Sequence, residues 1–244
     1  MEKIRKLKKD IIEENFFRPK WYSIFINPYF INRNSIYNEI SNFAKKTYKN
    51  DKILDIGCGI KPYHHLFESK EYIGIDIHGG GHANEAKNVD VFYNGLHIPF
   101  PDNSFQTLIC TQVLEHTTDP EILMKEMSRV LTPNGKIFIS MPFIYPEHEK
   151  PFDFKRFTQF EHVRLLERNG FKDIIIKQNT GLFGTFGQLF VIFMFEGIHF
   201  TASFLKMLLS ILIFAPIQII SIILDSITKK AGPTMDYIIT ANKK

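Results

Sequence analysis

The sequence is poor in cysteine, with two in 244 residues, Cys58 and Cys110. Two thiols exclude a disulfide-rich scaffold and a four-thiolate metal site, and their scarcity is typical of a reducing compartment. A strong excess of charge is also missing, because the net charge is only +4. A charge this small, without a clustered basic patch, speaks against nucleic acid as a partner. The apolar fraction of 44% excludes wholesale disorder.

The N-terminal fifty residues form a polar, aromatic segment that is expected to be a cap. Five of the first nine residues are basic, but neither an apolar stretch nor a cleavage site of a secretory signal follows them. Ten aromatic residues lie between positions 16 and 48, and residues 35–48 are expected to form a helix. Two interpretations stay open: the segment packs on the main domain, or it lies against an anionic membrane.

From residue 51, short apolar runs alternate with amphipathic stretches. The pattern predicts strands at 53–56, 72–77, 105–110, 136–141 and 171–177, with helices at 121–131 and 160–168. Strands that alternate with helices predict an α/β fold with a parallel sheet and right-handed crossovers. Such sheets bind their ligands at the carboxyl ends of the central strands.

The first of these strands ends in Asp55 and a glycine loop. Gly57 and Gly59 allow a sharp turn and let a ligand approach the backbone closely. A dinucleotide fingerprint would need a third glycine where Pro62 stands, and an acid before the loop suits a pyrophosphate poorly. Asp76 follows Gly57 by nineteen residues, where such folds place the acid that binds both hydroxyls of a ribose. The spacing therefore predicts a nucleoside site.

Five collinear motifs carry a resemblance to a known family. They read ILDIGCG at 53–59, GID at 74–76, IPFPDNSF at 98–105, QVLEH at 112–116 and RVLTPNGK at 129–136. In order and spacing they resemble the class I S-adenosylmethionine-dependent methyltransferases, in the small-molecule branch that includes the ubiquinone-type enzymes. The resemblance implies a Rossmann-like sheet, mostly parallel with an antiparallel last strand, and an enzyme that methylates a small acceptor.

The resemblance also implies which residues hold S-adenosylmethionine. Asp55 would orient the amino end of the methionine moiety, helped by the main chain of Gly57, Cys58 and Gly59. Asp76 would bind the ribose hydroxyls.

The implied adenine and sulfonium contacts lie further along the chain. Ile77 would pack on the adenine face, Asn94 and Gly95 would lie at the adenine amine, and Gln112 near the sulfonium. The family usually has an aspartate at the position of Asn94, so here an amide would have to read the amine.

Two histidines are candidates for a general base, which methyl transfer needs when the acceptor is a weakly acidic hydroxyl. In the pair Glu115-His116, the carboxylate would orient the imidazole; the alternative is a packing and capping pair at the next helix. His148 lies in the loop 142–158, which follows the carboxyl end of a strand, where this kind of sheet binds its acceptor.

The same loop supplies the expected acceptor-binding residues Tyr145, Asp153 and Arg156. The alternative is that Asp153 and Arg156 only fix the loop to the helix that begins near Thr158. No metal ion is expected, because the nine histidines are scattered and neither His64-His65 nor Glu147-His148-Glu149 comes with a convincing third ligand.

An insertion of about fifty residues, apolar over most of its length, separates the sixth strand from the expected last strand at 235–241. Residues 182–224 contain two formally charged side chains, Glu196 and Lys206, and eight phenylalanines. Residues 204–224 are long enough to cross a bilayer, although Pro216 is expected to kink them.

The preceding run, 182–195, is short and is expected to be interrupted by Gly184 and Gly187. Because both ends of the insertion rejoin one sheet, the chain crosses a bilayer twice or not at all. One long and one short segment therefore favour a re-entrant or in-plane hairpin, with Lys229-Lys230 at an anionic leaflet. The alternative is a buried dimer interface or an enlarged core.

The sequence thus predicts three parts: a cap at 1–50, a methyltransferase domain at 51–180 plus 233–244, and a hairpin insertion at 181–232. The expected function is methyl transfer to a membrane-associated or lipid-linked acceptor, such as a lipid, a quinone-like molecule or a glycan, at the cytoplasmic face of a membrane. Two alternatives stay open. The first is a soluble small-molecule methyltransferase whose hairpin forms the interface of a homodimer, and the second is a non-catalytic adaptor with this fold.

Overall fold

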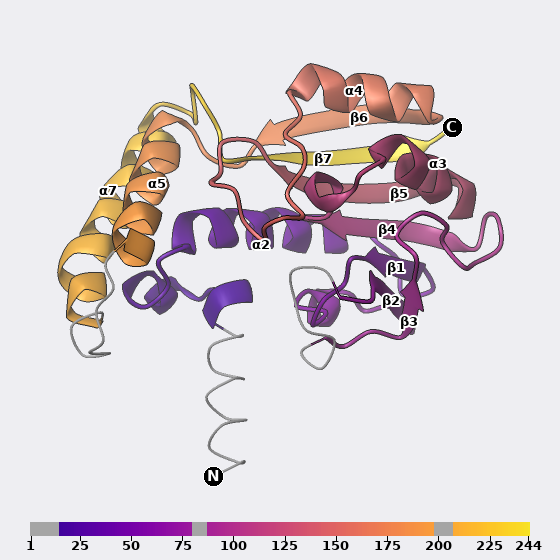
Figure 1. The fold of residues 1–244 in the computed structure, drawn as a ribbon, viewed down its shortest axis with the longest axis horizontal. Helices are drawn as coiled ribbons and strands as arrows, with labels where there is room; N and C mark the ends of the chain where they lie inside the picture. Colours follow the sequence, from indigo (N-terminus) through magenta and orange to yellow (C-terminus); the bar gives the residue numbers. More distant parts are fainter. Residues whose placement is uncertain (1–14, 80–86, 198–206) are drawn as a thin grey trace, which may run out of the picture. The chain divides into compact units, whose positions relative to one another are not determined.

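The computed structural model describes residues 15–79, 87–197 and 207–244 (Figure 1). The chain divides into two compact units. Unit 1 comprises residues 1–39 and 178–236, and unit 2 comprises residues 40–177 and 237–244. The basic residues at 1–9 and Lys206 lie outside the described residues.

Unit 2 is built on a seven-stranded sheet in the order β3-β2-β1-β4-β5-β7-β6 (Figure 1). Strand β1 pairs in parallel with β2 and β4, β2 with β3, and β4 with β5. Strand β7 runs antiparallel to β6, because Lys244 N donates to Gly170 O at one end and Asn179 N to Asp236 O at the other. The strands are β1 (Lys52–Ile56), β2 (Glu71–Ile77), β3 (Val91–Tyr93), β4 (Phe105–Thr111), β5 (Leu131–Pro142), β6 (Phe171–Gln178) and β7 (Asp236–Lys243).

The central strands are apolar because both faces of the sheet are covered. Leu54, Ile56, Leu108 and Ile139 are all buried in the core. Near-continuous apolar runs of this kind are typical of parallel strands under helices. The carboxyl ends of β1, β2 and β4 therefore meet at one edge of the sheet, followed by the loops that carry the predicted site residues.

Helices α3 (Pro120–Val130) and α4 (Gln159–Arg168) lie side by side in unit 2 (Figure 1). Each has a side-chain cap: Asp119 accepts from Ile122 N, and Thr158 accepts from Glu161 N. Such caps satisfy backbone donors that would otherwise lack a partner at a helix N-terminus. Two short 3-10 helices, η2 (His64–Leu66) and η4 (Leu114–His116), lie in the loops after β1 and β4.

The predicted sheet and its antiparallel last strand are confirmed, with three local differences. Strand β3 was not predicted, because three residues are too few for a periodic signal. The strand expected at 136–141 starts earlier, because β5 begins at Leu131, and its pairing with β4 shifts register between Phe105 and Thr107. The helix expected at 35–48 is α2 (Phe30–Ala44), which starts earlier and begins in unit 1.

Unit 1 contains a pair of apolar helices and part of the N-terminal segment (Figure 1). Helix α5 (Leu182–Gly197) packs along a helix that spans Met207–Ile227. The second helix contains the π-helical segment η5 (Ser210–Phe214) and then α7 (Ala215–Ile227). Pro216 cannot donate a backbone hydrogen bond and clashes with the preceding turn, so a π-helical turn before it is the expected accommodation.

The two glycines of α5 do not interrupt it, contrary to the prediction. A Cβ atom on Gly187 would lie 2.0 Å from Ser221 Oγ, and one on Gly184 would lie 2.3 Å from Asp225 Oδ2. These glycines therefore let α5 and α7 approach closely, as small residues do between packed helices. We call α5 and the helix Met207–Ile227 together the apolar hairpin.

The N-terminal segment and the insertion, which the sequence analysis treats as separate parts, belong to the same unit. Gln188 Nε2 donates to Pro28 O, and Gln218 Nε2 donates to Ile24 O at 3.3 Å. Both glutamines are buried, so these bonds satisfy polar groups inside the unit. The 3-10 helix η1 (Trp21–Phe25) thus packs against the polar side of the apolar hairpin.

Candidate functional site

The loop after β1 is closed by main-chain hydrogen bonds and by Asp76. Gly57 has a φ of 65°, which favours glycine, and a Cβ there would lie 2.3 Å from Val113 Cγ2. Gly59 N donates to Asp76 Oδ2 at 3.0 Å, and Cys58 N donates to Ile75 O at 3.0 Å. A Cβ on Gly59 would meet nothing within 4 Å, so the loop leaves room for a ligand beside its backbone.

Asp76 holds its carboxylate at the carboxyl end of β2. Besides Gly59, its donors are Ile77 N at 2.7 Å and Lys87 Nζ at 3.0 Å, both to Oδ1. Lys87 is a partner that the sequence analysis missed, because no local pattern relates it to Asp76. A carboxylate has about four lone-pair positions, and these three donors use three of them. Binding both hydroxyls of a ribose therefore requires one donor to give way, and the Lys87 ammonium, which also donates to Ile77 O and Gly79 O, is the one with other partners.

Asp55 is buried at the end of β1 and accepts a hydrogen bond from Tyr72 Oη at 2.7 Å. Burial raises the pKa of Asp55 to about 7, while Tyr72 and Lys61 oppose the shift and Asp76 adds to it. The loss of water around the charged form dominates this shift. Tyr72 is a second partner that the sequence analysis did not foresee.

The raised pKa of Asp55 predicts a pH-dependent stability. The neutral form is favoured in the folded state, so this contribution is complete below pH 4 and is lost as pH rises through about 7. A shift of this size corresponds to up to about 4 kcal/mol. We expect Asp55→Asn to lose less free energy of unfolding than the wild type between pH 5 and pH 8, measured by urea titration. An equal loss in both proteins would contradict the burial of a titrating Asp55.

The residues expected at the adenine end follow β2 and β3. Ile77 is 37% exposed, and Gly95 has a φ of 79° with Ile77 Cγ2 lying 3.3 Å from the position of a Cβ. Asn94 Oδ1 accepts from Leu96 N at 2.9 Å and from His97 N at 2.8 Å. The oxygen that would read an adenine amine thus already shapes the turn, which the sequence did not reveal.

Gln112 follows β4 and is fixed by β5. Its φ is 56°, its backbone N donates to Ser140 O at 2.9 Å, and its Nε2 donates to Ser140 Oγ at 3.1 Å. These bonds hold the Gln112 side chain at the carboxyl edge of the sheet, where the glycine loop also lies. A sequence pattern could not predict Ser140 as its partner.

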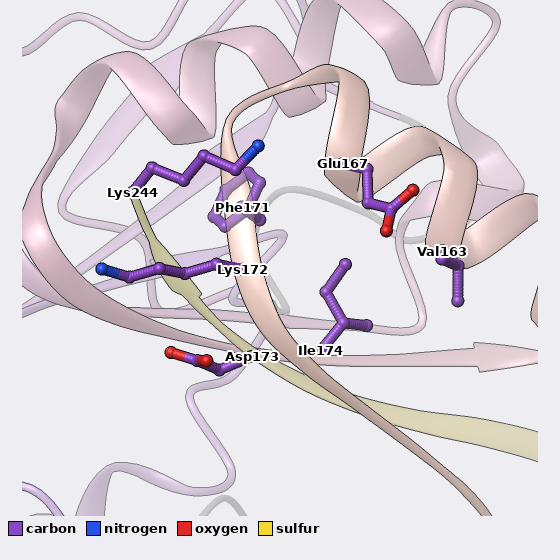
Figure 2. Close-up of a pocket in the computed structure, with 7 residues that line it drawn as sticks. All are labelled: Val163, Glu167, Phe171, Lys172, Asp173, Ile174 and Lys244. Atoms are coloured by element: carbon purple, nitrogen blue, oxygen red, sulfur yellow. The ribbon is translucent and has the colours of Figure 1, made fainter.

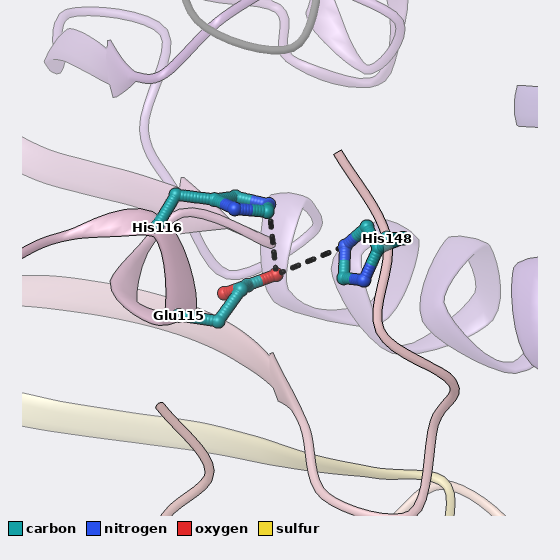
Figure 3. A group of neighbouring side chains, drawn as sticks. All are labelled: Glu115, His116 and His148. Carbon is teal, nitrogen blue, oxygen red and sulfur yellow. Dashed lines mark ion pairs between the residues drawn. The ribbon is translucent and has the colours of Figure 1, made fainter. Parts of the chain in front are cut away.

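Three side chains converge beyond Gln112, as Figure 3 shows: Glu115, His116 and His148. We call them the Glu115 cluster. Glu115 Oε1 lies 3.8 Å from His116 Nε2 and 4.0 Å from His148 Nε2. Glu115 is fully buried, whereas both histidines are partly exposed.

The second ring nitrogen of His116, Nδ1, faces a backbone acceptor. His116 Nδ1 lies 2.9 Å from Phe152 O, in hydrogen-bond geometry. A backbone carbonyl thus lies at Nδ1 of His116, whereas Glu115, which was expected to orient this imidazole, lies on its Nε2 side. The pair Glu115-His116 does not cap the next helix, which Asp119 caps.

His148 is held by Asp153 in the loop after β5. The Nδ1 atom lies 3.1 Å from Asp153 Oδ2, off the line of a hydrogen bond, and the His148 backbone N–H donates to that oxygen at 3.0 Å. Arg156 binds both oxygens of Asp153, at 2.5 and 2.7 Å. Burial opposes ionisation of Asp153, but Arg156 and the His148 N–H lower its pKa to about 2.

The electrostatics favour a neutral His148. Burial lowers the pKa of His148, the nearby charge of Asp153 opposes this, and His116 adds to the lowering. The Tyr145 ring packs edge-on against the His148 ring, with centroids 5.3 Å apart. Tyr145, Asp153 and Arg156 thus all contribute to the position of His148, whereas their contact with an acceptor stays a prediction.

Figure 2 shows a hollow of about 510 Å³ at a different place in unit 2. Its lining comes from α4, the start of β6 and the C-terminal Lys244. Because β6 runs parallel to β1, its start lies at the edge of the sheet opposite the glycine loop. None of the predicted site residues line this hollow, so we do not assign the chemistry to it.

A family model described as a methyltransferase domain matches residues 54–139. The uncharacterized protein MJ0638 of Methanocaldococcus jannaschii is 32% identical over 154 residues, which cover 61% of this chain and 67% of that protein. This match extends well beyond the five motifs.

Relatives with a named activity match over shorter stretches. The ubiquinone/menaquinone biosynthesis C-methyltransferase UbiE of Pseudoalteromonas translucida is 38% identical over 75 residues, covering 29% of this chain and 30% of that protein. The tRNA U34 carboxymethyltransferase of Campylobacter curvus is 29% identical over 103 residues, covering 38% and 35%. The chain thus spans about a third of the length of these two relatives.

Solved structures share the fold. A SAM-dependent methyltransferase from Archaeoglobus fulgidus aligns with a TM-score of 0.54 and 18% identity, covering 96% of this chain and 99% of that one. A phosphoethanolamine N-methyltransferase from Haemonchus contortus, in complex with S-adenosyl-L-methionine, has a TM-score of 0.55 and 16% identity, covering 95% and 59%.

Proposed function

Because the chain belongs to the class I S-adenosylmethionine-dependent methyltransferases, we propose that it methylates a small acceptor that a membrane presents, such as a lipid or lipid-linked molecule. The enzyme class and the cofactor, S-adenosylmethionine, follow from the family. When bound, this cofactor supplies an electrophilic methyl group on a sulfonium. The proposal concerns the residues that bind it and the nature of the acceptor.

On the cofactor side, we propose that the loop after β1 binds the methionine end and that Asp76 binds the ribose. The room beside Gly59 and the buried carboxylate of Asp55 support this assignment. Gln112, fixed by Ser140, would lie near the sulfonium. Asn94 Oδ1 already accepts from two backbone donors. We therefore propose that Ile77 packs on the face of the adenine and Gly95 contacts its edge, while Asn94 shapes the turn.

The observation that carries the membrane proposal is that the apolar hairpin has its polar side chains inside. The buried residues of α7 are Ala215, Gln218, Ser221 and Asp225, three of them polar. Large apolar side chains point to the surface instead, among them Phe186, Phe190, Phe193, Ile219, Ile220 and Ile223. A soluble helix buries its apolar stripe and exposes its polar one. This reversed pattern suits a surface that faces lipid.

The lengths of the two helices support a hairpin that enters the membrane and returns to the same side, rather than one that crosses the bilayer twice. The helix Met207–Ile227 has 21 residues and a mean hydropathy of 2.6, and only 28% of its apolar window is buried. A core helix of a soluble protein would be mostly buried. Its length of about 31 Å matches the ~30 Å hydrocarbon core of a bilayer. The 16 residues of α5 reach only about 24 Å.

Both helices of the apolar hairpin end at a shared polar base. The carboxylate of Asp225 accepts from Gly181 N at 2.7 Å and from Phe183 N at 3.0 Å, which caps the start of α5. Leu182 N donates to Ala231 O at 2.9 Å, and Lys230 Nζ donates to Asn179 O at 2.8 Å. A re-entrant hairpin needs such a base, because both ends stay on one side of the membrane.

Other side chains of unit 1 suit a membrane interface. Trp21 in η1 is 79% exposed, and tryptophan is enriched where headgroups meet water. Exposed Lys229 lies at the base of the apolar hairpin and would meet anionic headgroups. The two buried free cysteines fit a reducing compartment, so the proposal includes the cytoplasmic face.

The proposal is tested by presenting the full chain with vesicles and with extracts. We expect the protein to sediment with anionic vesicles, and to transfer radioactive methyl groups from S-adenosylmethionine to a membrane lipid extract. A soluble metabolite extract and total tRNA serve as controls for the other acceptor classes.

Label confined to the soluble extract or to tRNA would contradict a lipid acceptor. A protein that ignores vesicles and forms a dimer in light scattering would instead support the apolar hairpin as a subunit interface.

A further inference from the structure

We infer that the Glu115 cluster is a binding site for one divalent transition-metal ion. The sequence predicts no metal site, because no convincing third ligand accompanies His148 in its loop. The structure supplies two ligands from another loop: Glu115 and His116, which follow β4, whereas His148 follows β5. Neighbouring parallel strands bring these loops together at the carboxyl edge of the sheet.

The three ligand atoms converge on one point. They all lie within 4.8 Å of one another, and Figure 3 shows both imidazoles directed at the carboxylate. Nitrogen and oxygen ligands at ~2.1 Å from a tetrahedral zinc ion lie ~3.4 Å apart. Glu115 Oε1 lies 3.8 and 4.0 Å from the two Nε2 atoms, and no pair of the three atoms is more than 4.8 Å apart, so side-chain rotations would have to draw the ligands together by up to about 1.4 Å to complete the site.

The second, independent observation is the support behind each histidine. Metal-binding histidines usually direct their other ring nitrogen at a carboxylate or a backbone carbonyl, which selects the tautomer and orients the ring. Here His116 Nδ1 lies 2.9 Å from Phe152 O in hydrogen-bond geometry, and His148 Nδ1 lies 3.1 Å from the Asp153 carboxylate, at hydrogen-bond distance but off the line of the bond. Both arrangements leave the Nε2 lone pairs for the centre of the cluster. Arg156 in turn fixes Asp153.

The donor set identifies the class of ion. Two imidazoles and one carboxylate suit zinc, iron, cobalt or nickel better than magnesium or calcium, which prefer oxygen ligands. Three protein ligands leave at least one coordination position open, as in catalytic rather than structural sites. Glu149 Oε2 lies 3.9 Å from His116 Nε2, close enough to become a fourth ligand.

An open position gives the ion a role at the acceptor, and this part of the inference rests on the proposed function. A bound cation can coordinate an acceptor oxygen and lower the pKa of its hydroxyl, which removes the need for a histidine base. His116 and His148 would then be ligands rather than bases, and the proton of the coordinated hydroxyl would pass to water.

The test measures metal binding directly, in the full-length protein after chelator treatment. Titration with Co²⁺ alone is expected to give a visible ligand-field absorption that saturates at one equivalent, and Zn²⁺ is expected to displace it. His116→Ala, His148→Ala and the nearly isosteric Glu115→Gln should each weaken Co²⁺ binding at least ~10–100-fold, the range known for supporting residues alone. His97→Ala, an exposed histidine outside the cluster, is the matched control and should bind normally.

The inference is overturned if no saturable absorption develops, or if the three cluster variants bind Co²⁺ as tightly as the wild type does. Circular dichroism and S-adenosylmethionine affinity of the variants verify that they are folded. Normal Co²⁺ binding without turnover on a lipid extract would refute the proposed acceptor and leave the metal site standing. Turnover on lipid without Co²⁺ binding would do the reverse.

Discussion

Replacing Phe193, Ile220 and Ile223 together by glutamate is expected to abolish sedimentation with anionic vesicles. These side chains are 72%, 56% and 53% exposed, so the change removes little packing from unit 1. Transfer of one large apolar side chain from water to an apolar phase contributes ~1.5–3 kcal/mol. Losing three such contributions, before the cost of burying three carboxylates, corresponds to at least ~1000-fold weaker vesicle binding.

The matched control is Phe160→Glu, which alters an equally exposed apolar side chain on α4, at 76% exposure. This variant should sediment like the wild type. The triple variant should keep its S-adenosylmethionine affinity but lose turnover on a lipid extract. If it sediments as well as the wild type, the apolar hairpin does not face lipid, and a dimer becomes the explanation for its exposed side chains.

The second large effect is expected from Asp76→Ala, which should weaken S-adenosylmethionine binding ~100–10,000-fold in calorimetric titration. The variant loses two hydrogen bonds from ribose hydroxyls to a charged acceptor, each contributing ~1.5–3 kcal/mol. It also releases Gly59 N and Lys87 Nζ, which Asp76 now binds. A loosened glycine loop would add to the loss.

Asp76→Asn separates these two contributions, because an amide retains one acceptor oxygen for Gly59. We expect it to bind S-adenosylmethionine more tightly than Asp76→Ala does and more weakly than the wild type does. Asp173→Ala, a carboxylate change on β6 at the far edge of the sheet, is the control and should bind normally. Unchanged affinity in both Asp76 variants would remove this residue from the cofactor site.

The fold could be predicted because its signals are local. Buried strands such as 105–110 are nearly continuous apolar runs, helices such as α3 show the 3.6-residue period, and the motifs follow in the order of the family. Since parallel strands end at one edge, Asp55, Asp76 and Gln112 could be expected at a common site from their positions alone. Strand β3 and the irregular start of β5 gave no such signal, because pairing with neighbours defines them.

The sequence by itself determined the enzyme family, the mostly parallel sheet with its antiparallel last strand, the cofactor and the presence of an apolar insertion, since all of these depend on residue types at short spacings. Only the tertiary structure decided which distant side chains meet. It brought His148 to Glu115 and His116, gave Asp55 and Asp76 their partners Tyr72 and Lys87, and turned the polar side of the apolar hairpin inward. Contacts of this kind depend on how loops from neighbouring strands and packed helices fill space, which periodicity along the chain does not record.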